Sequence, residues 1–355
     1  MMRTRGISLF VFFLLVTVGC GSEHATHLAY VTLPALNAIG AYRVQNDSGE
    51  LTRIFGSPFD GGTSPASIVV HPSNKFLYVA NQGEHNISLF GIDGRTGEPS
   101  EVTPRVPAGV TPVALAMDPG GSFLFVANQT SNTISVFSID SGSGALTEVA
   151  GSPFATAQSP VALALSPSGK FLYVANSNLG AVSGYSVSAG VMTAVPNSPF
   201  LVGSVPFAVA VDPSEHFLYV ANSLDNSLSA FTINASTGSL TSVSGTPVTT
   251  GTNPVAIAFD ASGKFLYTAN RGSNNISGFS IDASTGKLTE IDDSPFTPAG
   301  APVFLVFDSL SNLLVVANQS DQSIGQFTID SSTGALDSGP TATFDSAPTA
   351  IALTR

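Results

Sequence analysis

The sequence predicts an all-β fold, a seven-bladed β-propeller whose blades are four-stranded antiparallel sheets, and three observations lead to it. A short run of aromatic and β-branched residues that ends in Asn recurs at intervals of 46 to 48 residues. A polar turn of constant design follows several of these runs. The last apolar segment lacks partner strands of its own, whereas the first unit lacks one strand. Such a period is typical of repeat architectures, and the complementary ends indicate a closed ring.

The recurring run is clearest at Phe171–Asn176, which reads Phe-Leu-Tyr-Val-Ala-Asn. Aromatic and β-branched residues favour strands, and the final Asn suits a turn. A weaker copy at Leu28–Thr32 places Tyr30 48 residues before Tyr78, which brings the number of copies to seven. The other copies are Phe76–Asn81, Phe123–Asn128, Phe217–Asn222, Phe265–Asn270 and Leu313–Asn318.

The third unit shows all four expected strands of a blade, at 113–117, 123–127, 134–139 and 145–149. The turn Asp140–Gly144 joins the last two, and its opening Asp and closing Gly suit a type I turn that ends in a residue with positive φ. The same turn recurs at Asn234–Gly238, Asp282–Gly286 and Asp330–Gly334.

The first strand of a unit, such as 161–165, alternates small and large apolar residues. This pattern favours a crowded inner strand beside a central channel. A segment containing Ser-Pro-Phe follows the fourth strand of several units. Its Pro interrupts the outer strand and protects that strand from pairing with another chain, and we expect its Phe to pack between units. These segments are Gly56–Phe59, Gly151–Phe154, Asn197–Phe200 and Asp293–Phe296.

Both ends of the chain contribute to one sheet in this prediction. The first unit offers strands at 28–32, 39–44 and 51–55, and the segment 347–353 matches the first strand of the other units. We therefore expect the C-terminal strand to complete the N-terminal blade, so that one propeller domain extends over 28–353. The least marked strand is the fourth of the second unit, near 100–103.

The chain is acidic, with a net charge of −12 and a pI of about 4.6. Contact with phosphate backbones needs clustered Lys and Arg, and no basic run occurs after residue 5. We therefore expect no nucleic-acid partner. The single cysteine, Cys20, excludes an internal disulfide. We expect a monomer.

Residues 1–19 have the features of a signal peptide. Arg3 and Arg5 precede the apolar segment 7–18, which is too short to span a bilayer as a helix. The segment resembles a bacterial lipoprotein signal peptide, which implies that Cys20 carries a lipid and that 20–27 form a tether. An ordinary secretory signal with an incidental Cys is the alternative. In either case we expect the protein to leave the cytoplasm, and in the first case we expect it at the cell envelope, attached to the membrane by its lipid.

The repeats resemble the seven-bladed propellers of the lactonase family, which includes propeller-type 6-phosphogluconolactonases, and the YVTN-repeat propellers of microbial surfaces. The resemblance covers about 28–353 and rests on the strand–Asn signature. Hydrolytic members usually carry Pro-Arg-His at the start of several inner strands. This chain instead has Pro-Val-Ala after Ser159 and at two further inner strands, starting at Pro112 and Pro254. One match remains, because Asn270-Arg271-Gly272 is similar to the family's Asn-Arg-Gly.

Two functions are compatible with this sequence: a binding module that takes a protein or glycan on one face, and a lactonase that opens a sugar lactone. Lactone hydrolysis needs a base for water and donors for the oxyanion. As a hypothesis, Arg271 holds an anionic substrate and His85 or Glu84 activates water; the alternative is that they are solvated loop residues. The other candidates for this binding face are Gln82, Gln129, Asp225, Asn226, Gln319 and Asp321.

The remaining polar residues have structural interpretations first. The Asn residues that end the runs could line a binding funnel, but near-identical copies in six units favour caps of the following turns. No cofactor is expected, because the sequence lacks a Gly-rich phosphate loop and a Gly-x-Ser-x-Gly elbow. Polar residues in the turns of the opposite face form no close cluster of ligands, so we expect no metal site. These are His71, Asp118, Asp212, Glu215, His216 and Asp260.

Overall fold

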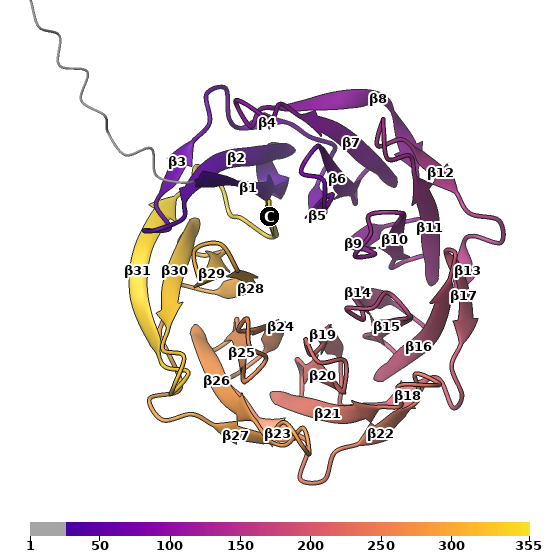
Figure 1. The fold of residues 1–355 in the computed structure, drawn as a ribbon, viewed down its shortest axis with the longest axis vertical. Coiled ribbons are helices and arrows are strands. Elements are labelled where there is room, and N and C mark those ends of the chain that lie inside the picture. Colours follow the sequence, from indigo (N-terminus) through magenta and orange to yellow (C-terminus); the bar gives the residue numbers. More distant parts are fainter. Residues whose placement is uncertain (1–25) are drawn as a thin grey trace, which may run out of the picture.

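The computed structural model describes residues 26–355, from which seven antiparallel β-sheets are built. The sheets surround a central axis as the blades of a propeller, and the strands of each blade succeed one another from the axis outward (Figure 1). The predicted signal peptide, Cys20 and most of the predicted tether lie outside the described residues. The seven-bladed propeller that the sequence predicts is confirmed.

Each blade has four main strands, numbered here from the first, at the axis, to the fourth, at the rim. Blade 1 contains β32 (Ile351–Leu353), β1 (Thr26–Leu33), β2 (Ala38–Gln45) and β3 (Leu51–Arg53). Blade 2 contains β5 (Pro65–Val70), β6 (Phe76–Asn81), β7 (Asn86–Ile92) and β8 (Pro99–Pro107). Blade 3 contains β9 (Pro112–Met117), β10 (Phe123–Asn128), β11 (Thr133–Ile139) and β12 (Leu146–Glu148). Blade 4 contains β14 (Pro160–Leu165), β15 (Phe171–Asn176), β16 (Ala181–Ser188) and β17 (Val191–Ala194).

The other blades follow the same plan. Blade 5 contains β19 (Pro206–Val211), β20 (Phe217–Asn222), β21 (Ser227–Ile233) and β22 (Leu240–Ser242). Blade 6 contains β24 (Pro254–Phe259), β25 (Phe265–Asn270), β26 (Asn275–Ile281) and β27 (Leu288–Glu290). Blade 7 contains β28 (Pro302–Asp308), β29 (Leu313–Asn318), β30 (Ser323–Ile329) and β31 (Leu336–Thr343). Two-residue strands extend blades 1, 3, 4 and 5, and these are β4 (Phe59–Asp60), β13 (Phe154–Ala155), β18 (Phe200–Leu201) and β23 (Val248–Thr249).

Helix is nearly missing from the part of the chain that the structure describes. A single short 3-10 helix, η1 (Pro34–Leu36), links β1 to β2. Within residues 26–355, no helix has the length and apolar character needed to cross a membrane.

Blade 1 joins the two ends of the ring. β32 pairs with β1 in antiparallel register, with Tyr30 opposite Ala352. Thr32 extends this pairing, because its N–H donates to the carbonyl of Ala350 at 3.0 Å and its Oγ1 accepts the N–H of Ala350 at 2.9 Å. The prediction that the C-terminal strand completes the N-terminal blade is therefore confirmed.

The recurring run forms the second strand of each blade and is buried on both faces. In blade 6, Phe265, Tyr267 and Ala269 share a core with Leu314 and Val316 of blade 7. Successive side chains of a strand point to opposite faces. The aromatic residues of one run therefore face the next blade, whereas the Leu and Val residues face the preceding one.

The Tyr of the run also binds the turn of the next blade. The hydroxyl of Tyr173 donates to the carbonyl of Gly238 at 2.8 Å, and burial raises the pKa of Tyr173, so the hydroxyl remains a donor. Gly238 has a φ of +73°, and a Cβ there would lie 2.4 Å from the ring of Phe171. The recurring run of one blade and the polar turn of the next blade thus occur together in the sequence because they are in direct contact in the structure. The equivalent bonds join Tyr30 to Gly97, Tyr78 to Gly144, Tyr219 to Gly286 and Tyr267 to Gly334.

Two features of the blade rims differ from the sequence prediction. The fourth strand of blade 2, β8, spans Pro99–Pro107 rather than 100–103, because its pairing with β7 continues past an irregularity. The Ser-Pro-Phe segments interrupt the outer strand as predicted, but the chain then resumes pairing with the third strand, as β4 does with β2. The expected packing of the Phe between blades is confirmed at Phe296, in the core between blades 6 and 7.

A buried ion pair adds to the closure between blades 1 and 7. The Nε2 atom of His27 lies 2.9 Å from Oδ2 of Asp308, and the two side chains are 3% and 2% exposed. Nδ1 of His27 lies 2.8 Å from Oδ1 of Asn46. Burial by itself lowers the pKa of His27, but the Asp308 carboxylate and the Asn46 amide outweigh it and raise the pKa. The imidazolium form is therefore favoured in the folded ring.

This raised pKa gives the ring a pH-dependent stability. The stabilisation is present in full below the ordinary pKa of His, about 6.5, and is lost as the pH rises through the higher pKa of the folded state. We expect His27→Asn to lower the free energy of unfolding by about 3 kcal/mol near pH 6, because Asp308 is left buried without its partner. Near pH 9 the loss should be smaller, since His27 of the parent protein is then neutral. Urea unfolding at both pH values measures this, with the exposed His216→Asn as control, and an equal loss at both would contradict it.

Candidate functional site

The loops predicted to form the binding face do lie together. In blade 2 the loop after the second strand bonds to the loop that leads into the first, since the N–H of Gln82 donates to the carbonyl of Ser64 at 3.1 Å. The same bond links Gln129 to Thr111 at 2.8 Å. One face of the ring therefore presents all nine predicted residues, from blades 2, 3, 5, 6 and 7. These are Gln82, Glu84, His85, Gln129, Asp225, Asn226, Arg271, Gln319 and Asp321.

His85 holds two blades together. It is exposed and has a φ of +59°, and its Nδ1 accepts the backbone N–H of Thr111 in the loop before blade 3, at 3.2 Å. Four other blades make the same link with Asn, as Asn226 does to the N–H of Asn253 at 2.8 Å. His85 thus occupies the position of a recurring Asn latch. The other latches are Asn37 to Ser64, Asn132 to Ser159 and Asn274 to Ala301.

Glu84 belongs to a second recurring link. Its Oε1 accepts the N–H and the hydroxyl of Thr63, at 3.2 and 2.6 Å, and its Oε2 accepts from Asn86 and pairs with Arg105. Hydrogen bonds from Thr63, then from Asn86 and Arg105, lower the pKa of Glu84 to about 2. A carboxylate this acidic is a weak base at neutral pH. The same backbone link is made by Ser131, Asp225, Ser273 and Asp321.

The other predicted residues are less engaged. Arg271 is exposed, and its side chain makes no hydrogen bond or ion pair to any residue in 26–355. The side chains of Gln82, Gln129 and Gln319 likewise have no hydrogen-bond partner within that range. The predicted residues of this face thus fall into two groups. One group links the loops and blades, and the other has side chains that are free to contact a ligand.

The Asn residues that end the runs have a structural role, although not the predicted one. They are fully buried. In blade 5, Asn222 donates to the hydroxyls of Ser227 and Ser229 on the third strand, at 3.2 and 2.9 Å, and accepts the N–H of Gly203 at 3.1 Å. The side chain thus joins two strands and the incoming loop rather than only capping the next turn. The members of this ring are Asn81, Asn128, Asn176, Asn222, Asn270 and Asn318.

The polar residues of the opposite face serve the turns in which they lie. Oδ1 of Asp212 accepts the N–H of Phe217 at 2.7 Å, and Asp260 repeats this contact with Phe265. His71 reaches the next blade, where its Nε2 lies 2.9 Å from the carbonyl of Gly121. Among the described residues, no three His, Cys, Asp or Glu side chains gather closely enough to hold a metal ion.

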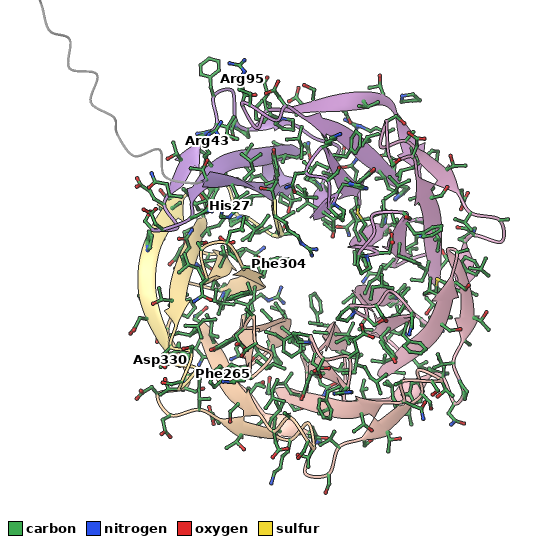
Figure 2. The ribbon with its side chains drawn as sticks, in the orientation of Figure 1. His27, Arg43, Arg95, Phe265, Phe304 and Asp330 are labelled. Carbon is green, nitrogen blue, oxygen red and sulfur yellow. The ribbon has the colours of Figure 1, made fainter. Side chains whose placement is uncertain are left out.

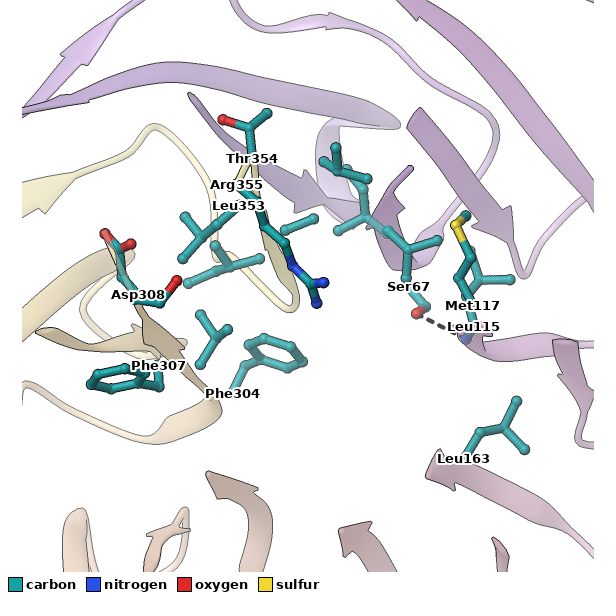
Figure 3. Close-up of a pocket in the computed structure, with 17 residues that line it drawn as sticks. Ser67, Leu115, Met117, Leu163, Phe304, Phe307, Asp308, Leu353, Thr354 and Arg355 are labelled. Carbon is teal, nitrogen blue, oxygen red and sulfur yellow. Dashed lines mark hydrogen bonds between the residues drawn. The ribbon is translucent and has the colours of Figure 1, made fainter. Parts of the chain in front are cut away.

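A cavity of about 440 Å³ lies in the central channel, and the sequence analysis did not predict the arginine that lines it. Leu115, Met117, Leu163 and Phe304 contribute apolar walls from three inner strands. Figure 3 shows the guanidinium of Arg355 projecting into this space, near Phe304. Arg355 follows the last strand, so no repeat position marks it as a channel residue.

The three predicted catalytic residues are missing from the linings of the five best-formed cavities of the described ring. Five cavities of the described ring, from about 180 to 440 Å³, are lined without His85, Glu84 or Arg271. These residues come from blades 2 and 6, and two of them bind loops of their own face. Their action on a substrate stays a prediction.

Comparison with known families agrees with the observed blade count. The sequence model of the family described as "Lactonase, 7-bladed beta-propeller" matches residues 23–162, 150–259 and 243–352. The chain belongs to this lactonase propeller family. No curated protein matches the sequence significantly.

Solved structures with the same fold are distant in sequence. A candidate 6-phosphogluconolactonase of Bacteroides fragilis is 19% identical, with a TM-score of 0.81 over 94% of this chain and 99% of that one. A similar candidate from Bacteroides uniformis is 18% identical, with a TM-score of 0.80 over 93% and 99%. The periplasmic gluconolactonase of Pseudomonas aeruginosa is 17% identical, with a TM-score of 0.77 over 93% and 99%. At such identities the likeness shows the fold alone.

If His85 acts as a structural latch, Asn can replace it without loss of stability. We expect His85→Asn to keep the free energy of unfolding within roughly 0.5 kcal/mol of the parent protein, because Asn makes the same link in four blades. His85→Ala should lower it by about 1 kcal/mol, since the N–H of Thr111 loses its acceptor. Urea unfolding measures both, and Asn132→Ala is the matched control in blade 3. Equal losses in the two His85 variants would reject the latch.

Proposed function

We propose that this lactonase-family propeller is an exported binding module of the cell envelope, attached to the membrane by a lipid on Cys20. It takes a protein or a glycan on one face of the ring. One observation carries the proposal: the candidate base residues of the loop face are already hydrogen bonded to its backbone. His85 accepts from Thr111, and Glu84 accepts from Thr63 with its pKa lowered to about 2.

The inner strands support the same view. The hydrolytic members that the sequence resembles carry Arg and His where inner strands begin, whereas this chain has Val or another apolar or small residue after Pro at those places. At the central cavity these strands contribute apolar side chains such as Leu115, Leu163 and Phe304. Among the described residues, the two candidate bases of the loop face are thus bound to backbone groups, and the inner strands begin without Arg or His.

Lactone hydrolysis is the second candidate, and Arg271 favours it. This residue lies in the Asn-Arg-Gly segment, is exposed and has no partner among residues 26–355. A free guanidinium suits a carboxylate or phosphate group of a substrate. Solved structures of the same fold are described as candidate 6-phosphogluconolactonases and a periplasmic gluconolactonase.

A lactone assay decides between the two candidates. With gluconolactone and 6-phosphogluconolactone as substrates, we expect no turnover above the buffer rate from the parent protein, His85→Asn or Arg271→Ala. The physical reason is that the two candidate bases, His85 and Glu84, already accept hydrogen bonds from the backbone of the loop face. Turnover by the parent protein that falls a hundredfold or so in Arg271→Ala or His85→Asn, as general-base and oxyanion effects of about that size predict, would replace the binding proposal with the enzymatic one.

Attachment to the membrane is tested by Cys20→Ser. We expect the parent protein in the membrane fraction and the Cys20→Ser variant in the soluble fraction, because a serine hydroxyl does not accept the thioether-linked lipid. Ser22→Ala is the control and should remain in the membrane fraction. An unchanged distribution of the Cys20→Ser variant would mean that no lipid on this residue holds the protein.

A further inference from the structure

Three arginine side chains gather at the rim between blades 1 and 2 of the described ring. A cavity of about 330 Å³ there is lined by Arg43, Arg53 and Arg95, with Phe55 beside them. The sequence has 12 Lys and Arg residues, of which Arg3 and Arg5 precede the described part. Three of the remaining ten thus meet at one cavity. We call these four residues, Arg43, Arg53, Phe55 and Arg95, the rim patch.

Comparison among the blades shows that the fold does not require these residues. Arg53 stands opposite Tyr42, and the residues that take its place in three other blades are the acids Glu101, Glu148 and Glu290. Arg43 stands where five blades have Ser or Thr, namely Ser138, Ser186, Thr232, Ser280 and Thr328. A repeat that departs from its own pattern toward one chemistry points to a function other than folding.

Phe55 and Arg95 depart from the pattern in the same way. Phe55 follows the fourth strand and is 96% exposed, and its counterpart in blade 3 is Ala150. Arg95 lies in the turn between β7 and β8, where four other blades carry Gly or Ser. A fully exposed Phe is costly to hydrate. An aromatic ring beside guanidinium groups is a combination that suits the interface of an anionic membrane.

The arginines remain available to a ligand. Nη2 of Arg43 donates to the carbonyls of Arg95 and Thr96 at 3.1 and 2.9 Å, which holds its guanidinium over the turn of blade 2 and leaves other N–H groups free. Arg53 has only an exposed contact to Asp345, at 3.7 Å, which contributes little. Glu98 is the one carboxylate that lines the cavity. Figure 2 shows Arg43 and Arg95 side by side at the outer edge of the ring.

The described chain begins beside this patch. Thr26, the first residue of β1, pairs with Gln45 of β2, and Leu28 of β1 is opposite Arg43. The turn after β2 and the turn that bears Arg95 both connect third and fourth strands, so they lie on the same face. Six residue steps separate Cys20 from Thr26, which reach about 20 Å when extended. A lipid on Cys20 would therefore bring this face to the membrane surface.

We propose that the rim patch docks this propeller onto anionic phospholipids, with Arg43, Arg53 and Arg95 on lipid phosphates and Phe55 in the interface. The inference rests on the proposed function in one respect, the lipid on Cys20, which directs this face to the membrane. The patch sets the orientation of the ring and leaves the opposite face, with Arg271, open to partners. Each arginine near an anionic surface strengthens binding about fivefold.

The absence of Trp from the sequence provides a clean test. In the exported, processed chain, Phe55→Trp places a single fluorophore in the patch, and Ala150→Trp places one at the matched position of blade 3. With vesicles of phosphatidylcholine and phosphatidylglycerol, we expect the emission of Trp at 55 to shift to shorter wavelength and the emission of Trp at 150 to stay unchanged. The shift should weaken with added salt, because the attraction to phosphate is screened.

The arginines are tested in the same background. Arg53→Gln with Arg95→Gln should lower the affinity of the patch for phosphatidylglycerol vesicles by about 25-fold and reduce the shift. Removing Arg43 as well should lower the affinity by about a hundredfold. The double variant keeps Arg43 and its contacts to blade 2, so it remains informative if the triple variant folds poorly. Arg271→Gln, on the opposite face, is the matched charge control and should leave the shift unchanged.

Each other outcome has a definite meaning. A chain that binds phosphatidylcholine vesicles while Trp at 55 never shifts would overturn the patch and leave the lipid anchor intact. If the protein does not bind phosphatidylcholine vesicles but the emission of Trp at 55 shifts with phosphatidylglycerol vesicles, the rim patch is supported and the lipid anchor is overturned. No binding to either kind of vesicle would overturn both. A shift produced by inorganic phosphate without vesicles, and none with them, would replace the membrane with a soluble anion as partner.

Discussion

The second strand of each blade is buried on both faces between its neighbours, and the rest of the ring depends on this contact. Phe, Tyr and Ala of one run meet Leu and Val of the next, so no blade covers its apolar surface alone. An open row of seven blades would leave two such faces in water. Pairing of β32 with β1 removes both, and the buried His27–Asp308 pair acts at the same seam.

The polar residues of the loops also hold neighbouring strands and blades together. The buried Asn ring joins second strands to third strands, and the Asn or His85 latches join five of the seven blades to the next blade. A face that looks like a set of binding groups in the sequence is therefore largely occupied with its own backbone. Buried or bridging polar groups need partners, and in a repeat protein each blade supplies them for its neighbour.

A few residues differ from the repeat pattern and distinguish this protein from a ring of identical blades. Arg355 in the central cavity, Arg271 on the loop face and the rim patch are each found in one place of the ring. Membership in the lactonase family sets the scaffold on which these groups are placed and leaves their use open. In the function that we propose, the ring is fixed to the membrane at its rim and presents one face outward to a partner.

The sequence by itself determined the blade number, the order of strands and the closure of the ring. Period, alternation and turn residues are local features, and local sequence specifies them directly. Only the tertiary structure decided that His85 replaces an Asn latch, that Glu84 is paired with Thr63 and Arg105, and that Arg43, Arg53 and Arg95 meet at one rim. The physical reason is that these contacts join different loops and blades, often 20 or more residues apart along the chain, and such partners leave no mark in the spacing of neighbouring residues.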